Sequence, residues 1–130
     1  MTDSIVRDRV IEYLAALSAH DVDRIVACVT EDFVNEHTSA LGSTSNGREV
    51  YRGRLPGFLG QFEGIRYDVV DTIVEGERAA VRYRMTAMFE DHALDIPGVM
   101  LFSTRDGLIA QRTDVWDSLT FLRQTGMAPE

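Results

Sequence analysis

An aspartate in the last third of the chain has the surroundings that proton transfer requires. Residues 108–116 have the alternating pattern of a strand, in which successive side chains point to opposite faces, so Arg112, Asp114 and Trp116 share one face. Trp116 is expected to face inward, since its large ring gains from burial, and Asp114 then faces inward with it. A carboxylate in an apolar pocket holds a proton more readily than one in water, which suits it to acid/base chemistry near neutral pH.

A histidine and a tyrosine from the first half of the chain could share that chemistry. His37 lies near the end of a short run of mixed polarity, residues 33–38, and a neutral imidazole can accept a proton from an activated carbon or from water. Paired with Asp114, it would act as the base while the carboxylate orients it. Tyr13 lies on the apolar face of a predicted helix, where its hydroxyl could donate to a developing enolate oxygen.

Each of these three residues also has a structural interpretation that the sequence leaves open. Asp114 could pair with Arg112, or cap a backbone amide, on an exposed face. His37 could make a single hydrogen bond at the edge of a loop. Tyr13 could pack in the core with its hydroxyl at the surface.

The N-terminal half of the chain predicts three helices that would support these residues. Apolar side chains recur at spacings of three and four over residues 5–19 and again over residues 22–29. This spacing indicates a helical hairpin in which Asp21 caps the second helix. A third amphipathic helix is expected over residues 51–62, and Pro56 should kink or break it.

The C-terminal half predicts two β-hairpins. Residues 65–74 and 79–89 are rich in β-branched and aromatic side chains. Residues 99–104 and 108–116 flank an Asp-Gly pair, which favours a tight hairpin turn. Helices followed by such an antiparallel meander predict an α+β fold, with three N-terminal helices packed on a curved, mainly antiparallel sheet that encloses a pocket.

Length and composition limit the classes to which this chain can belong. Its 130 residues make about one domain, so a single domain is expected over residues 1–130. A net charge of −8 disfavours nucleic acid and membrane surfaces as partners. With no evident secretory leader or spanning segment and a single cysteine, a cytoplasmic location is expected. No zinc-like cluster, phosphate-binding glycine loop or serine nucleophile motif occurs, so neither a metal nor a cofactor is expected.

Three sequence motifs accompany this order of elements. They are Tyr-Leu-Ala-Ala-Leu at 13–17, Asp-Val-Asp at 21–23 before Glu-Asp-Phe at 31–33, and Gly-Leu-Ile-Ala-Gln-Arg-Thr-Asp-Val-Trp-Asp at 107–117. Together they resemble the nuclear transport factor 2-like superfamily, which includes ketosteroid isomerases and SnoaL-like polyketide cyclases. The resemblance spans nearly the whole chain and implies a cone-shaped α+β barrel and a homodimer formed through the sheet.

The resemblance assigns family positions to individual residues. Tyr13 falls where ketosteroid isomerases keep an oxyanion-hole tyrosine, whereas His37 stands in place of their general-base aspartate. Val99 stands in place of their protonated aspartic acid, whose hydrogen bond a valine cannot donate. Both changes argue against steroid isomerisation. Asp114, on the last long strand, is similar to the carboxylate proposed as the acid/base in SnoaL-like cyclases.

These observations lead to one leading hypothesis for function. The chain would be a cofactor-independent enzyme that transfers a proton on a small, largely apolar oxygenated molecule, by isomerisation or aldol-type ring closure, with residues 38–47 as a lid. His37 and Asp114 would share the acid/base work, and Tyr13 would donate to the oxyanion. The substrate-binding residues would be Trp116, Phe58, Phe62, Tyr51, Met85, Val99 and Arg112.

Two alternatives stay open beside it. The chain could be a non-catalytic ligand-binding or dimerisation module of the same fold, in which case Asp114 should be ion-paired and His37 should not share a cavity with it. It could also be an epoxide hydrolase-like enzyme, in which Arg112 and Asp114 would jointly hold a water. The sequence leaves open whether the chain is catalytic, and on which substrate.

Overall fold

The computed structural model describes residues 2–128, which form four helices and six strands. The helices are α1 (Thr2–Ser18), α2 (Val22–Val26), α3 (Arg48–Gln61) and α4 (Ser118–Gln124). The strands are β1 (Val29–His37), β2 (Ser45–Asn46), β3 (Glu63–Glu75), β4 (Arg78–Phe89), β5 (His92–Arg105) and β6 (Leu108–Trp116). None of the described helices has the length and apolar content needed to cross a membrane.

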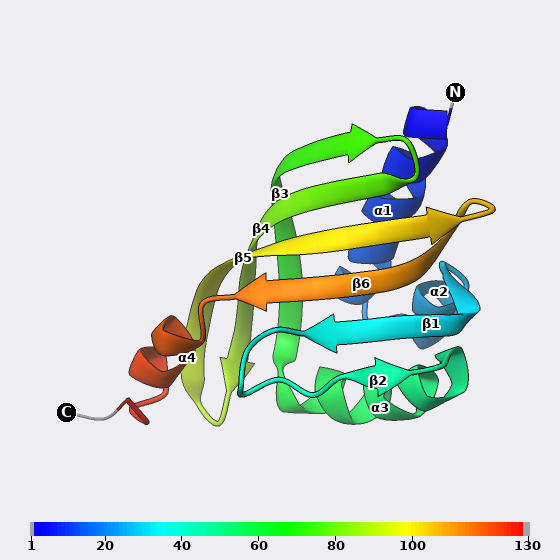
Figure 1. Cartoon of the computed structure of the whole chain (residues 1–130). Helices are drawn as coiled ribbons and strands as arrows, with labels where there is room; N and C mark the ends of the chain where they lie inside the picture. The colour runs from blue at the N-terminus through cyan, green and yellow to red at the C-terminus, as the bar shows by residue number, and fades with distance from the viewer. Residues whose placement is uncertain (1, 129–130) are drawn as a thin grey trace.

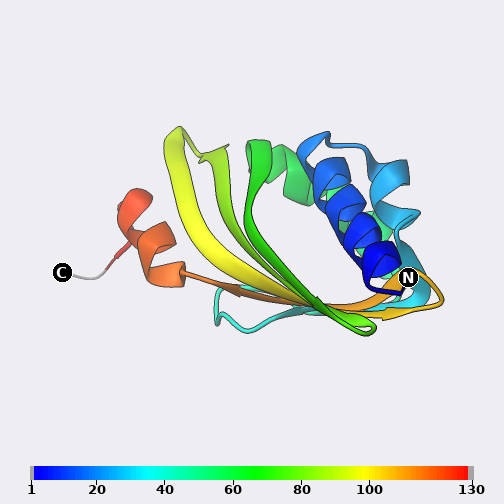
Figure 2. The same ribbon diagram turned by 90° about the horizontal axis from the view of Figure 1, so that it is seen from above.

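The six strands form one sheet in the order β2-β1-β6-β5-β4-β3 (Figure 1). β1 runs parallel to β6 and every other neighbouring pair is antiparallel, so the sheet is mixed and mostly antiparallel. The long strands β3, β4 and β5 curve, and α1, α2 and α3 lie together on the concave side (Figure 2). The predicted α+β fold, with helices packed on a curved sheet, is confirmed.

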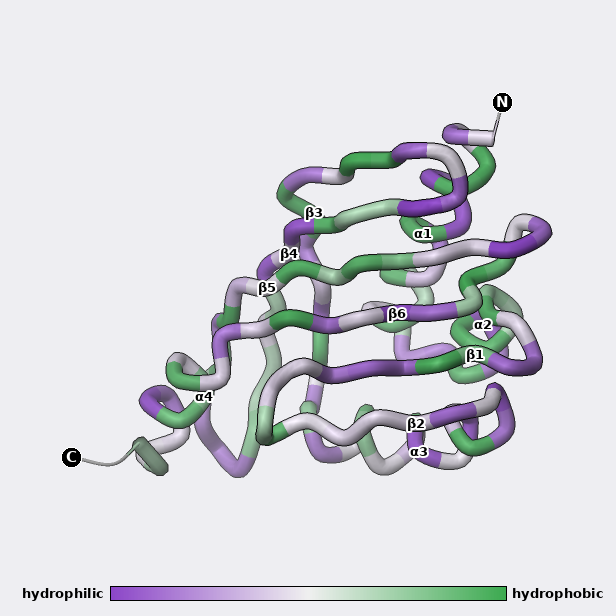
Figure 3. The backbone as a smooth tube through the Cα atoms, viewed as in Figure 1, coloured by the Kyte–Doolittle hydropathy of each residue, from purple (hydrophilic) through white to green (hydrophobic). Residues whose placement is uncertain are grey.

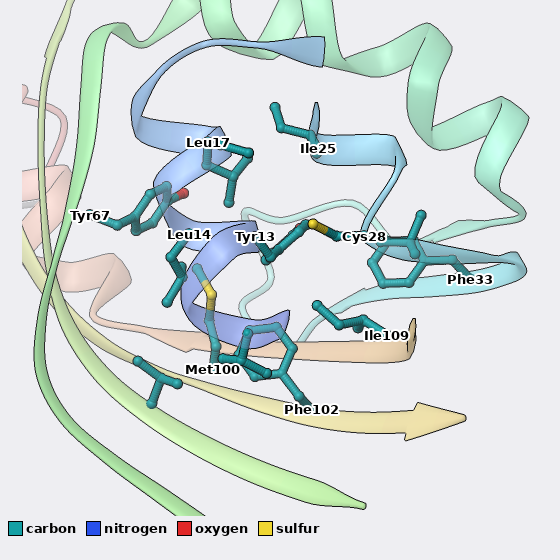
Figure 4. Close-up of a cluster of buried hydrophobic side chains, with 14 of the residues drawn as sticks. Tyr13, Leu14, Leu17, Ile25, Cys28, Phe33, Tyr67, Met100, Phe102 and Ile109 are labelled. Carbon is teal, nitrogen blue, oxygen red and sulfur yellow. The ribbon is translucent and has the colours of Figure 1, made fainter. Parts of the chain in front are cut away.

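The main core lies between α1 and the inner face of the sheet. Val6, Val10, Tyr13, Leu14 and Leu17, spaced by three and four residues along α1, are all buried. Figure 4 shows this face of α1 meeting side chains that come from the strands. Figure 3 shows green, hydrophobic stretches in β5 and purple, hydrophilic residues at the turn into β6. A second, smaller apolar cluster joins α4 to the neighbouring ends of β4 and β5.

The hairpin turn between β5 and β6 and the N-terminal cap of α2 both form as the sequence predicts. The Asp106 and Gly107 backbones have φ angles of 53° and 78°. Both angles are in the left-handed region, which a tight two-residue hairpin turn requires. Asp21 caps α2, where its carboxylate accepts a hydrogen bond from the backbone amide of Arg24 at 3.2 Å.

Several boundaries differ from the sequence prediction, and the helix expected over residues 22–29 ends at Val26. β1 begins at Val29 rather than at residue 33, and β5 begins at His92 rather than at residue 99. The added parts pair with β6 and β4, so tertiary pairing extends strands that the local pattern leaves short. α3 continues through Pro56 instead of breaking there, and its packing through buried Tyr51 and Leu55 holds it in place.

Candidate active site

A cavity of about 930 Å³ lies between the inner face of the sheet, α3 and α4. Pockets for small organic ligands usually enclose about 300 to 1,000 Å³. Its wall is mostly apolar, with Leu41, Leu55, Phe58, Phe62, Met85, Phe89, Ile96, Trp116, Phe121, Leu122 and Met127. Its polar lining includes Asn35, His37, Tyr51, Arg54, Tyr67, Tyr83, Arg112 and Asp114. Within residues 2–128, no group of three or more His, Cys, Asp or Glu side chains is placed to hold a metal ion.

Arg112 and Asp114 form a buried ion pair on the wall of this cavity. Their side chains lie two residues apart on β6 and are only 3% and 5% exposed. Arg112 Nη2 donates to Asp114 Oδ2 at 2.7 Å, and the Tyr83 hydroxyl donates to Asp114 Oδ1 at 2.6 Å. The expectation that Asp114 faces inward is confirmed. Its pairing with Arg112, which we expected only on an exposed face, occurs in the interior.

Two more tyrosine hydroxyls continue this network beyond Arg112. Arg112 Nη1 donates to the Tyr13 hydroxyl at 2.8 Å, and the hydroxyl oxygens of Tyr13 and Tyr51 are hydrogen-bonded at 2.5 Å. Tyr51 is part of the cavity lining, whereas Tyr13 is fully buried and does not belong to it. The expectation that Tyr13 donates directly to a bound oxyanion is therefore corrected. α1 places its hydroxyl against Arg112 and Tyr51, so Tyr13 can act only through them.

Burial keeps the tyrosine hydroxyls around the cavity protonated. Desolvation raises the pKa of Tyr51, Tyr67 and Tyr83, and the Asp114 carboxylate raises that of Tyr83 further. Burial alone would lower the pKa of Arg112, but the neighbouring tyrosine oxygens and the Asp114 carboxylate outweigh it and raise that pKa well above its ordinary value. The network therefore presents neutral phenols and one permanent cation, all hydrogen-bond donors, beside a carboxylate.

His37 faces the same cavity from β1, the strand next to β6. It is aligned with Asp114 in the parallel pairing of the two strands. Its Nδ1 atom is buried and has no hydrogen-bond partner among the described residues. Burial, and then the Arg112 cation, lower the pKa of His37, although the Asp114 carboxylate opposes this shift. His37 is therefore a neutral imidazole with a free ring nitrogen at physiological pH.

The loop after β1 is held against His37 and β6. The backbone amide and the hydroxyl of Thr38 both donate to the carbonyl oxygen of Asp114 at 3.2 Å. From α3, Arg54 donates to two residues of the loop, each at 3.2 Å. Gly42 packs directly on His37 and leaves no room for a Cβ atom. The role of this loop as a lid stays a prediction.

All but one of the predicted substrate-binding residues line the cavity. Those that do are Trp116, Phe58, Phe62, Tyr51, Met85 and Arg112. Val99 does not, because it is aligned with the exposed Val115 on β6 and the exposed Arg82 on β4, on the outer face of the sheet. Alternate residues of a strand face opposite sides, so the family position of Val99 does not place it in this pocket.

Three more polar residues line the cavity without any signal in the sequence for a polar role, namely Asn35, Tyr67 and Tyr83. Asn35 Oδ1 is buried and has no hydrogen-bond partner among the described residues. The exposed arginines on either side of Tyr83 on β4 indicate that Tyr83 faces inward. The alternation predicts the face of the side chain but not its hydrogen-bond partner. The identity of its partner, Asp114, depends on the arrangement of three strands.

The match to a protein family covers most of this site. A model of the SnoaL-like domain matches residues 10–112. The chain belongs to the SnoaL-like domain family. The matched region includes His37 and Arg112 and ends just before Asp114. No curated protein matches this SnoaL-like chain significantly.

Solved structures share the fold of this SnoaL-like chain at low sequence identity. A proposed SnoaL-like polyketide cyclase from Jannaschia sp. CCS1 has a TM-score of 0.84 at 20% identity, with 99% of this chain and 96% of that chain covered. A protein with a ketosteroid isomerase-like fold from Catenulispora acidiphila, in complex with trimethylamine, has a TM-score of 0.83 at 19% identity and 93% coverage of each chain. AclR, a proposed hydroxylase from Streptomyces galilaeus, has a TM-score of 0.81 at 19% identity, with 98% of this chain and 89% of that chain covered. These likenesses show the nuclear transport factor 2-like fold.

Proposed function

We propose that the chain is an enzyme that moves a proton on a small, largely apolar oxygenated molecule, as in isomerisation or aldol-type ring closure. The observation that carries the proposal is the cavity shared by His37 and Asp114. His37 lines it from the strand next to that of the buried Asp114, and the buried Nδ1 atom of His37 has no hydrogen-bond partner among the described residues. The mostly apolar wall lowers the local dielectric constant, which strengthens the interactions of both groups with a bound ligand.

The proposed chemistry starts from the neutral imidazole. His37 takes a proton from the carbon beside a carbonyl group, the C–H electron pair forms the C=C bond of an enolate, and the carbonyl π pair moves to oxygen. That oxygen accepts hydrogen bonds from donors of the cavity wall, for which Tyr51 and Arg112 are the candidates. The Asp114 carboxylate stabilises the imidazolium. Where a C=C bond is conjugated with the enolate, the imidazolium returns the proton to the far carbon of that bond, which gives an isomer. In ring closure, the enolate carbon attacks a second carbonyl group of the ligand, and the imidazolium protonates the new alkoxide.

A second candidate function, a ligand-binding or dimerisation module, is favoured by two observations. Asp114 is ion-paired with Arg112, as a purely structural carboxylate would be. The outer face of the sheet also exposes apolar side chains, among them Ile73 at 64% and Leu101 at 42%, which a second copy of the chain could cover. Light scattering would measure such a dimer, and Leu101→Lys should lower its fraction. The cavity that His37 shares with Asp114 is not expected of such a module.

Exchange of carbon-bound hydrogen tests the enzyme proposal without knowledge of the natural substrate. The probe is 2-tetralone, a bicyclic aromatic ketone with acidic α-hydrogens, and proton NMR in D₂O follows the loss of their signals. Quenching of Trp116, the single tryptophan of the chain and part of the cavity wall, measures binding separately. We expect exchange above the buffer rate, and a loss of about 100-fold or more in His37→Gln and in Asp114→Asn. His92→Gln, at the exposed start of β5, is the matched control and should behave like the unmodified protein.

Each other outcome has a distinct meaning. Binding of the ketone without exchange contradicts the enzyme proposal for this class of substrate and favours the binding module. Exchange that persists in both His37→Gln and Asp114→Asn places the base elsewhere. Absence of binding excludes aromatic ketones of this size as ligands of the cavity.

A further inference from the structure

We infer that Gly98 is a positioning residue for Asp114: because β5 carries no side chain at this point, the Tyr83 hydroxyl can reach across from β4 and hold the carboxylate on β6. The inference rests on the proposed function only for its catalytic consequence, since Asp114 is the proposed partner of the base. The contacts themselves join three neighbouring strands, and they can be tested whether or not the chain is an enzyme.

The residues concerned lie on the inner face of adjacent strands. Gly98 is aligned with Tyr83 on one side and with Trp116 on the other, and Asp114 lies two residues before Trp116 on β6. Neighbouring strands are about 4.8 Å apart, so β4 and β6 are separated by about 9.6 Å with β5 between them. A tyrosine can bridge this gap only if its ring lies over the middle strand.

Gly98 supplies the space that this crossing needs. A Cβ atom on Gly98 would overlap the Tyr83 hydroxyl and would lie 2.5 Å from Cζ and 3.0 Å from Cε2 of the same ring. Gly98 is not among the glycines with a positive φ angle, so the requirement is for space and not for conformational freedom. Any side chain at this position must displace the Tyr83 ring, β5 or both.

The crossing completes the set of donors around the carboxylate. Tyr83 donates to Asp114 Oδ1 at 2.6 Å and Arg112 donates to Oδ2 at 2.7 Å, so the carboxylate cannot rotate without losing a hydrogen bond. Burial, and then the Asp114 charge, raise the pKa of Tyr83, which keeps its hydroxyl a donor. The other ionisable groups around Asp114 are Arg112 on its own strand, His37 on β1 and Tyr67 on β3. The orientation of the carboxylate relative to His37 therefore depends on the Tyr83 contact.

NMR of the Asp114 side-chain carboxyl carbon tests the inference in the whole protein without a ligand. The variants are Gly98→Ala, Tyr83→Phe and their combination. The control is Gly60→Ala, at a helical glycine where an added Cβ would meet no atom within 4 Å. We expect Gly98→Ala and Tyr83→Phe to move the Asp114 signal in the same direction and to a similar extent, because both remove the same hydrogen bond. The combination should move the signal no further, and Gly60→Ala should leave it unchanged.

A double-variant comparison keeps the test decisive if Gly98→Ala alone does not fold. Tyr83→Leu removes the ring that a new methyl group would meet, so Gly98→Ala should cost much less stability in that background than in the unmodified chain. An Asp114 signal that Gly98→Ala leaves in place, additive effects of the two single variants, or equal stability losses in both backgrounds would overturn the inference. If the ketone fails to exchange while the NMR result holds, only the acid/base role of Asp114 is lost.

Discussion

Asp114→Asn should destabilise the fold because it leaves a buried cation without its anion. The carboxylate accepts from Tyr83 with one oxygen and from Arg112 with the other. An asparagine of nearly the same shape offers one acceptor oxygen and one NH₂ donor, so either the phenol or the guanidinium then faces a donor. The substitution therefore removes the charge and one acceptor while leaving the packing volume almost unchanged.

The size of the effect follows from burial, and the chain offers a matched control. Removing one partner of a buried ion pair usually costs about 3 to 5 kcal/mol, because the remaining charge stays desolvated. Arg66 and Asp68 are also two residues apart on one strand and in contact at 2.9 Å, but their side chains are 68% and 50% exposed. Exposed pairs contribute about 1 kcal/mol or less. Asp114→Asn should therefore cost several times more stability than Asp68→Asn.

Urea unfolding followed by circular dichroism measures this difference. With a slope of about 1 to 3 kcal/mol per M, a loss of about 3 kcal/mol lowers the midpoint by about 1 to 3 M. Adding Arg112→Met to Asp114→Asn should recover stability, since it removes the stranded charge. Equal losses in Asp114→Asn and Asp68→Asn, or a further loss on adding Arg112→Met, would refute the view that the two buried charges neutralise each other.

Two further predictions concern His37 and the glycine packed on it. The His37 imidazole should titrate below pH 6.5, because burial and then the Arg112 cation lower its pKa, and an NMR midpoint at or above 6.5 would contradict this. Since the folded chain then binds this proton less tightly than the unfolded chain, the free energy of unfolding should fall as the pH drops below 6.5, and His37→Gln should weaken that dependence. Gly42→Ala should cost about 1 to 3 kcal/mol in urea unfolding and shift the His37 ring signals, because the new Cβ would overlap His37 Cβ and lie 2.9 Å from Cγ. If Gly42→Ala were as stable as Gly60→Ala, the loop would be able to move away from His37 at no cost in stability, and the prediction would be wrong.

Periodicity was enough to predict which faces of the elements are buried. The spacing in α1 and the alternation in β6 place the observed residues inward, because the burial of apolar surface decides which face turns to the core. Strand lengths were harder to predict. Val29 joins β1 through its pairing with Ile109, and residues 92–98 join β5 through pairing with β4. Such pairings depend on segments far away in the sequence, so a local pattern cannot contain them.

The sequence predicted several residues of the candidate site but not the hydrogen bonds that join them. The strand pattern placed Asp114 inward, and the family position drew attention to His37. Tyr13 was expected to contact the ligand directly, but its hydroxyl instead accepts a hydrogen bond from Arg112. The sequence did not predict this contact. The reach of Tyr83 across β5 could not be foreseen from either strand alone. A glycine inside a strand often marks the close approach of another group, and Gly98 was the one local signal of that contact.

The pairing of Asp114 with Arg112, which we expected of a purely structural residue, is compatible with the proposed chemistry. A carboxylate alone in an apolar cavity favours its protonated form, and a neutral acid cannot stabilise the imidazolium that His37 would become. The Arg112 cation balances the charge of Asp114, so the site can be buried before any ligand enters. Arg112 Nε is itself buried and has no hydrogen-bond partner among the described residues. Because Arg112 also lines the cavity, its charge would, in the proposed chemistry, stabilise a ligand oxygen that gathers negative charge, while the Asp114 carboxyl group lies beside the base.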